Sequence, residues 1–151
     1  MAKAKLITPY GGKLVDLVAT GSERDELLGR APALPSIKIS MRNLCDLELL
    51  ATGAFSPLDR FMGKADYERV LHEMRLSNGV LFPLPITLTA DPEELPTVGS
   101  ELVLRNANND VMAVMTLEEV YHWDAATEGA LAYGSTDVKH PMVSEMARHA
   151  G

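Results

Sequence analysis

The chain has 151 residues, and 46% hydrophobic with 23% charged residues is a composition typical of one globular domain with a buried core. Its net charge of −7 argues against nucleic-acid binding, because phosphate binding relies on clustered Lys and Arg and the sequence has no basic run. A single cysteine excludes an intramolecular disulfide, and no window approaches the ~18 apolar residues that span a bilayer. The N-terminus lacks the apolar core of a signal peptide, so we expect a soluble, cytoplasmic chain with no membrane partner.

Residues 9–39 predict a turn, two short strands and a helix. The Gly11-Gly12 pair indicates a turn, followed by a short strand that ends at residue 18. A phosphate cradle is disfavoured, because the fuller Gly-rich spacing and the Lys-Ser/Thr ending are missing. Residues 23–28 have a helical pattern that the following prolines interrupt, and the alternation at 37–39 predicts a strand.

A central helix is predicted to begin after Ser40, whose side chain can accept a hydrogen bond from a free backbone N–H. Gly53 ends this helix, because glycine most easily takes the left-handed position after a helix. Apolar residues at helical spacing predict a broad buried stripe of Met41, Leu44, Cys45, Leu47 and Leu49. Within that stripe, Cys45 is expected to be an inert core residue rather than a nucleophile.

A fixed corner is predicted directly after the central helix. Pro57 keeps Ser56 out of helical geometry, so residues 55–58 are expected to be non-helical. Asp46 and Glu48 lie within the apolar run of the helix, where an unpaired charge is expensive. We therefore expect at least one of these carboxylates to cap or pair with the backbone of the corner.

The second half of the chain predicts two helices, a hairpin and a strand that is interrupted by prolines. A helix over about 65–75 should bury Tyr67, Val70, Leu71 and Met74 and stop at Asn78-Gly79. Two prolines lack ladder donors, so a strand in residues 80–89 should begin late or lie at a sheet edge. Apolar runs at 102–104 and 111–115 predict a hairpin with a longer loop, its second strand continuing to Tyr121. Residues 124–132 predict a short helix, and residues 144–150 are compatible with another.

Four motifs resemble the N-terminal domain of the ATP sulfurylase (sulfate adenylyltransferase) family. Cys45-Asp-Leu-Glu48, then Gly53-x-Phe-Ser-Pro-Leu58, matches the family's C-D-L-E and G-x-F-S-P-L. Residues 9–17 are similar to P-x-G-G-x-L-x-x-L, with Tyr10 where the family commonly has histidine. Residues 79–88 are similar to G-x-L-[FW]-P-x-P-[IV]-T-L, and residues 134–143 to G-T-T-D followed by H-P-x-V. The resemblance covers roughly residues 8 to 148.

The order of elements predicts an α+β fold, and the resemblance sharpens this to a PUA-like pseudo-barrel of mostly antiparallel strands with several short helices. It implies that residues 1–151 form a single N-terminal domain and that the catalytic domain is absent from this chain. The parent enzyme of sulfate assimilation would join ATP, with Mg, and sulfate into adenylyl sulfate and pyrophosphate. This domain would be inactive alone, would buttress the catalytic domain of the same polypeptide, and would belong to a homo-oligomer.

The residues that the family motifs carry are expected to be structural rather than catalytic. The family-motif residues are Asp46, Glu48, Gly53, Phe55, Ser56, Pro57 and Leu58. The resemblance places Thr136, Asp137, His140 and Pro141 at a domain junction. At the turn before Pro141, a structural hydrogen bond of His140 is preferred to a catalytic role.

No catalytic, cofactor-binding or metal-binding constellation is visible in the sequence. Residues 40–43 differ from the family's catalytic Q-x-R-N, no H-x-x-H follows, and Arg42 is read as part of a helical turn. No histidine pair has metal-ligand spacing, and the Glu93-Glu94 and Glu118-Glu119 pairs are expected to be solvated edges. Trp123 is expected to be a surface anchor at a strand end. Two alternatives stay open, a stand-alone interaction subunit and an RNA-binding PUA-like module, and the sequence leaves open a fused adenylylsulfate kinase in the parent.

Overall fold

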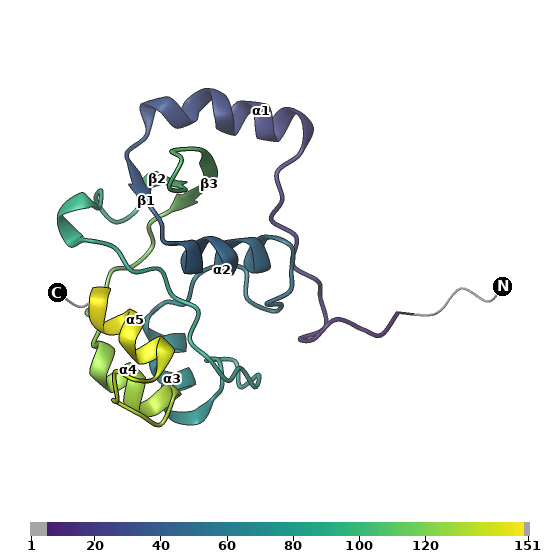
Figure 1. The fold of residues 1–151 in the computed structure, drawn as a ribbon. Helices are drawn as coiled ribbons and strands as arrows, with labels where there is room; N and C mark the ends of the chain where they lie inside the picture. The colour runs from purple at the N-terminus through teal and green to yellow at the C-terminus, as the bar shows by residue number, and fades with distance from the viewer. Residues whose placement is uncertain (1–5, 150–151) are drawn as a thin grey trace. The chain divides into compact units, whose positions relative to one another are not determined.

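The computed structural model describes residues 6–149, which fold into five α-helices, two 3₁₀ turns and a three-stranded sheet (Figure 1). In chain order the elements are α1 (Gly21–Arg30), η1 (Ala31–Ala33), β1 (Ser36–Lys38), α2 (Met41–Ala51), α3 (Lys64–Glu73), η2 (Pro92–Glu94), β2 (Glu101–Arg105), β3 (Val111–Thr116), α4 (Ala125–Ala132) and α5 (Pro141–His149). This content confirms the predicted α+β class, although the sheet is small and mixed rather than mostly antiparallel.

The chain divides into two compact units, each built from two separate segments. Unit 1 contains the described residues up to Phe61 together with Ala90–Leu117. Unit 2 contains Met62–Thr89 and the described residues from Glu118 onward. The assignment of residues 1–151 to a single domain stays a prediction.

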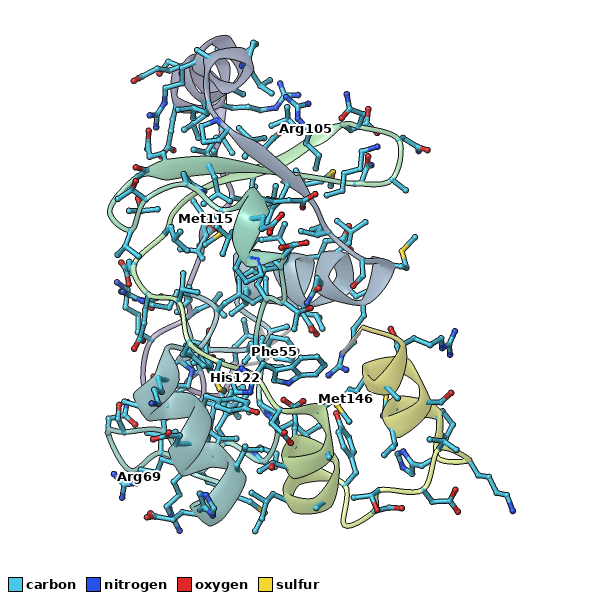
Figure 2. All side chains as sticks on the ribbon, turned by 90° about the vertical axis from the view of Figure 1, so that its left-hand side faces the viewer. Phe55, Arg69, Arg105, Met115, His122 and Met146 are labelled. Atoms are coloured by element: carbon cyan, nitrogen blue, oxygen red, sulfur yellow. The ribbon has the colours of Figure 1, made fainter. Side chains whose placement is uncertain are left out.

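The sheet of unit 1 is centred on β2, which is parallel to β1 and antiparallel to β3 (Figure 1). Its middle residues, Leu102, Val103 and Leu104, are at most 1% exposed, because a central strand is covered on both faces. In Figure 2, Arg105 marks the end of β2 and Met115 lies on β3. The predicted hairpin of β2 and β3 is confirmed.

Three predicted stretches of strand are wrong. Residues 14–18 form no ladder, because Val15 N–H donates to the Ser56 side chain and Leu17 N–H to the carbonyl of Ala51. Residues 80–89 contain only an isolated bridge from Leu81, since the prolines remove ladder donors. The strand β3 ends at Thr116, so its predicted continuation to residue 121 is wrong as well.

The central helix α2 has the predicted ends but a different buried face. Ser40 Oγ accepts a hydrogen bond from Asn43 N–H at 3.1 Å, and Gly53 adopts φ 80° beyond the last turn. The residues that α2 buries are Asn43 and Leu50, whereas Met41 is 72% exposed and Cys45 is exposed. The predicted burial of Met41, Cys45 and Leu49 is therefore wrong, whereas Leu44 and Leu47 of the predicted stripe are half-buried.

Helix α3 of unit 2 buries Tyr67, Val70 and Leu71 as predicted. It ends at Glu73, because Met74 adopts a left-handed φ of 52°, so the predicted stop at Asn78-Gly79 is wrong. The 56% exposure of Met74 also contradicts its predicted burial.

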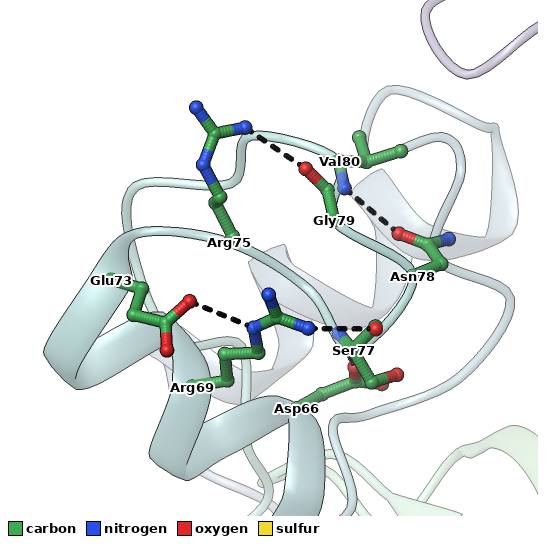
Figure 3. Close-up of polar contacts among 8 residues, drawn as sticks. All are labelled: Asp66, Arg69, Glu73, Arg75, Ser77, Asn78, Gly79 and Val80. Atoms are coloured by element: carbon green, nitrogen blue, oxygen red, sulfur yellow. Dashed lines mark hydrogen bonds and ion pairs between the residues drawn. The ribbon is translucent and has the colours of Figure 1, made fainter.

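The loop after α3 is held by side chains of the helix itself (Figure 3). Asp66 accepts a hydrogen bond from Ser77 N–H at 2.7 Å, and Arg69 donates to the Ser77 carbonyl at 2.9 Å. The guanidinium of Arg75 donates to the carbonyl of Gly79 at 2.9 Å. These bonds give the loop a defined shape despite its exposure.

The two C-terminal helices of unit 2 pack on each other through a glycine. A Cβ at Gly129 of α4 would lie 3.5 Å from Val143 Cγ2 and 3.6 Å from Met146 Cε, both on α5. Met146 is labelled in Figure 2. Val143 and Met146 are buried. Both predicted helices are confirmed over the described residues, although α5 begins earlier, at Pro141, and residue 150 lies outside the described residues. Within residues 6–149, no helix has the length and apolar character needed to cross a membrane.

Candidate functional site

The corner after α2 brings two of the sequence motifs together within unit 1. Ser56 is buried, and its hydroxyl accepts from Val15 N–H at 3.0 Å and donates to the Gly53 carbonyl at 2.7 Å. A Cβ at Gly53 would lie 2.1 Å from the Val15 carbonyl, and a Cβ at Gly11 would lie 2.7 Å from Pro57. Both glycines therefore permit a close approach of the N-terminal turn to the corner. The Ser56–Pro57 peptide bond is cis.

The two family-motif carboxylates do not support this corner. Asp46 Oδ2 lies 3.9 Å from Nε of Arg42, one helical turn earlier, and Glu48 is exposed. Partial burial raises the pKa of Asp46, and the nearby Arg42 guanidinium partly offsets this. The expectation that one of these carboxylates caps the corner is therefore wrong, because the N–H groups of Phe55, Ser56 and Leu58 already donate to backbone carbonyls.

Phe55 and Leu58 complete the motif on the apolar side of the corner. Leu58 is 5% exposed, and its N–H donates to the Phe55 carbonyl at 2.9 Å. Phe55 is half-buried. The motif thus forms a packed turn rather than an opening for a ligand.

The four predicted junction residues form a run of tight turns that leads into α5. The Asp137 carboxylate accepts from Lys139 N–H at 2.9 Å, and the Asp137 carbonyl accepts from His140 N–H at 2.9 Å. Thr136, Asp137 and Pro141 are exposed, and His140 is half-buried. The predicted turn hydrogen bond of His140 is made by its backbone. Its imidazole lies 5.5 Å from the Tyr133 ring, centroid to centroid, and its Nδ1 is buried without a hydrogen-bond partner among the described residues.

Unit 2 contains a buried carboxylate that was not predicted from the sequence. Glu128 of α4 is 3% exposed, and its Oε2 accepts from the Tyr67 hydroxyl at 3.1 Å and the Trp123 indole N–H at 2.7 Å. The ring of Tyr121 lies 5.4 Å from that of Tyr67, and its hydroxyl donates to the carbonyl of Met62 at 2.8 Å. Buried Tyr and Trp normally find acceptors, so a nearby acidic residue is the signal that could have found this cluster.

The cluster around Glu128 is built for packing rather than for proton transfer. Burial and the neighbouring Glu128 carboxylate raise the pKa of Tyr67, and burial together with Glu119 raises the pKa of Tyr121. Both phenols therefore stay neutral donors near pH 7, whereas a general acid or base works best with a pKa near the operating pH.

Two further expectations are corrected in unit 2. Trp123 is half-buried and donates to a buried carboxylate, so it is not a surface anchor. Glu119 is exposed as predicted, yet its Oε2 also accepts from Lys64 N–H at 2.9 Å and so caps α3. Glu93 and Glu94 are exposed as predicted. Among residues 6–149, no group of three or more His, Cys, Asp or Glu side chains could hold a metal ion.

Comparison with protein families gives one match that covers most of the chain. The family model described as a PUA-like domain matches residues 7–151. The chain belongs to the PUA-like domain family. The membership predicted from the motifs is thereby confirmed.

Three relatives of this PUA-like chain share one functional name. Proteins named sulfate adenylyltransferase from Symbiobacterium thermophilum and Staphylothermus marinus are each 42% identical, over 96% and 91% of this chain. A sulfate adenylyltransferase from Emericella nidulans is also 42% identical, over 90% of the chain. The chain covers 37%, 36% and 25% of the length of these three relatives, respectively.

A solved structure described as "Hexameric APS kinase from Thiobacillus denitrificans" has a similar fold. It superposes with a TM-score of 0.70 at 38% identity, over 78% of this chain and 24% of that chain. The motif-based resemblance to sulfate adenylyltransferases agrees with the relatives, and the motif at residues 53–58 lies in a packed turn of this PUA-like fold.

Proposed function

We propose that this chain is the N-terminal, non-catalytic domain of a sulfate adenylyltransferase. The observation that carries the proposal is the 42% identity over 96% of the chain to a protein of that name, of which the chain covers 37%. The parent would join ATP and sulfate into adenylyl sulfate and pyrophosphate, with Mg bound to the nucleotide. Catalysis of that reaction requires positioning and cationic stabilisation of the pyrophosphate that leaves.

The geometry of the described residues favours a structural role over a catalytic one. The motif at residues 53–58 is filled by its own hydrogen bonds and by Leu58, and the phenols near Glu128 are neutral donors. We infer that this domain buttresses the catalytic domain of the same polypeptide. The 64% exposure of Val138, two residues before His140, supports the junction as the place where that domain packs.

Two experiments test this function. Sequencing the source gene beyond codon 151 should reveal a frame that continues into Q-x-R-N followed by H-x-x-H. The isolated chain should show no sulfate-dependent exchange between ATP and pyrophosphate. A stop codon at position 152, or real exchange activity of the isolated chain, would contradict the proposal and turn the search to a stand-alone interaction or RNA-binding module.

A second candidate is that the parent is bifunctional and homo-oligomeric. The similar solved structure is described as a hexameric APS kinase, which favours both properties. A G-x-x-x-x-G-K-[ST] loop in the extended frame would support a fused kinase, because such a loop cradles nucleotide phosphates. If the loop is absent, the adenylyltransferase assignment stands and the proposal of a fused kinase is contradicted.

A further inference from the structure

One dipeptide of this chain is chemically labile, and the structure places it in the loop after α3. Asn78 is the only asparagine in the sequence that is followed by glycine. The backbone nitrogen of the next residue can attack the side-chain amide carbon of an asparagine, and glycine hinders this attack least because it has no Cβ. Asn78 is exposed, so water and base reach it from the solvent. Its reactivity therefore depends on the conformation of the loop.

The backbone hydrogen bonds of the loop identify its conformation. Gly79 N–H donates to the Leu76 carbonyl at 2.8 Å, and Leu76 N–H donates to the Val80 carbonyl at 2.9 Å. Gly79 has a φ of 87°. This combination is that of a three-residue hairpin loop, in which a left-handed glycine follows a type I turn. Asn78 thus occupies the third position of the turn, where ψ is about 0°.

This turn keeps the two reacting atoms apart. The attack produces a nearly planar five-membered imide ring, which closes only when the Gly79 nitrogen is eclipsed with Cβ of Asn78. At the ψ of a type I turn, that nitrogen is eclipsed with the backbone nitrogen of Asn78 instead. Val80 N–H also donates to Oδ1 of Asn78 at 3.0 Å and so holds the side-chain amide (Figure 3). Ring closure therefore requires a rotation that breaks the hydrogen bond from Gly79 N–H to Leu76.

Two charged side chains hold the turn closed (Figure 3). Oδ1 of Asp66, on α3, accepts from Ser77 N–H at 2.7 Å. The guanidinium of Arg75 donates to the Gly79 carbonyl at 2.9 Å. Each bond restrains a peptide group within two residues of Asn78, so the loss of either one favours local opening of the loop.

We propose that Asn78 is a site of spontaneous deamidation that the closed loop suppresses, so that the reaction proceeds through the open loop. In the open loop, base removes the proton of the Gly79 amide, the nitrogen bonds to Cγ of Asn78, and the Cγ–Nδ2 bond breaks to release ammonia. Water then opens the succinimide: attack at Cγ gives aspartate, and attack at the main-chain carbonyl carbon gives isoaspartate. Isoaspartate adds a methylene group to the main chain, so the three-residue turn cannot form again. The proposal does not rest on the activity of the parent.

The first test follows the 151-residue chain at mildly alkaline pH, folded and unfolded in urea, by peptide mapping with mass spectrometry. Aspartate and isoaspartate at position 78 should form at least about tenfold more slowly in the folded chain, because only its open fraction reacts. Equal rates overturn the proposal. Isoaspartate should appear in both states, and aspartate alone would mean direct hydrolysis of the side-chain amide and would overturn the succinimide route.

The second test opens the loop while the chain stays folded, which far-UV circular dichroism verifies. Arg75→Ala removes one donor to the loop and should raise the deamidation rate of the folded chain about fivefold. Arg105→Ala is the matched control, because Arg105 donates at 2.9 Å to the carbonyl of Asn109, also four residues later but in the other hairpin, and should change the rate less than about twofold. Asp66→Ala removes the acceptor of Ser77 N–H and replaces Arg75→Ala if that variant does not fold. Equal effects of the loop variant and the control overturn the proposal.

Discussion

At the scale of single residues, the most demanding position is the buried carboxylate of Glu128. Its Oε2 accepts hydrogen bonds from Tyr67 and Trp123, which come from a different helix and from the segment before α4. Burying a carboxylate is expensive unless donors replace the water that it loses. These two donors therefore link α3 to α4 within unit 2, and each of them should be sensitive to substitution.

Tyr67→Phe should destabilise the chain by about 1–3 kcal/mol, because the carboxylate loses one of its two donors while it remains buried. Urea unfolding followed by the fluorescence of Trp123, the single tryptophan, measures the loss in the unit that contains the bond. Glu128→Gln and the double variant complete a cycle. If the two substitutions are additive, the hydrogen bond is not the cause of the loss.

Alkaline pH should destabilise the fold through the buried phenol of Tyr67 and the half-buried phenol of Tyr121. The folded state raises the pKa of Tyr67 and Tyr121 above the ordinary value of 10.0, so the unfolded chain ionises first. The stability that these groups contribute is fully present below pH 10 and is lost as the pH rises above it. Each tyrosine contributes at most about 1.4 kcal/mol per pH unit. The free energy of unfolding, measured between pH 8 and 11, should fall less steeply in Tyr67→Phe, and an unchanged slope would contradict this account.

Gly53→Ala should destabilise the corner by about 2 kcal/mol or more. Its φ of +80° disfavours a side chain, and a Cβ would also lie 2.1 Å from the Val15 carbonyl oxygen. Gly12→Ala is the matched control, because Gly12 has a similar φ of +91° and nothing within 4 Å of the added Cβ. Thermal unfolding should show a clearly larger loss for position 53. Equal losses would mean that backbone conformation alone determines the cost.

At the scale of elements, the ends of helices show which caps stabilise the fold. Ser40 caps α2 by accepting from Asn43 N–H, whereas Thr20 at the start of α1 makes no side-chain cap hydrogen bond. Ser40→Ala should therefore lose about 1 kcal/mol of stability, and Thr20→Ala about 0.3 kcal/mol or less. Far-UV circular dichroism during urea unfolding compares the two. The reverse order would show that the geometric cap of α2 contributes nothing.

At the scale of the whole molecule, net charge should control self-association. The chain carries −7 at neutral pH and has an isoelectric point near 5.0. Repulsion between copies therefore weakens as the pH falls from 8 towards 5.5, so self-association of the chain should strengthen. Sedimentation velocity at the two pH values measures the change. Self-association that is unchanged between the two pH values would contradict this account.

Local features of the fold could be predicted from the sequence, and remote contacts could not. The cap at Ser40, the left-handed Gly53 and the turn of the hairpin depend on neighbours within a few residues, so their patterns were sufficient. The strand predicted at residues 14–18 failed because its backbone donates to the corner more than thirty residues later, at Ala51 and Ser56. A period of two indicates an extended segment but does not identify its partner.

The sequence alone determined the family, through motifs at residues 45–58 and 134–143, and the α+β class, through local capping and periodicity. Only the tertiary structure decided which faces are buried. It exposed Cys45, placed Asn43 in the interior and gave Glu128 its donors. The physical reason is separation along the chain: Tyr67 lies 61 residues from Glu128, and such contacts form only when the whole fold brings the segments together.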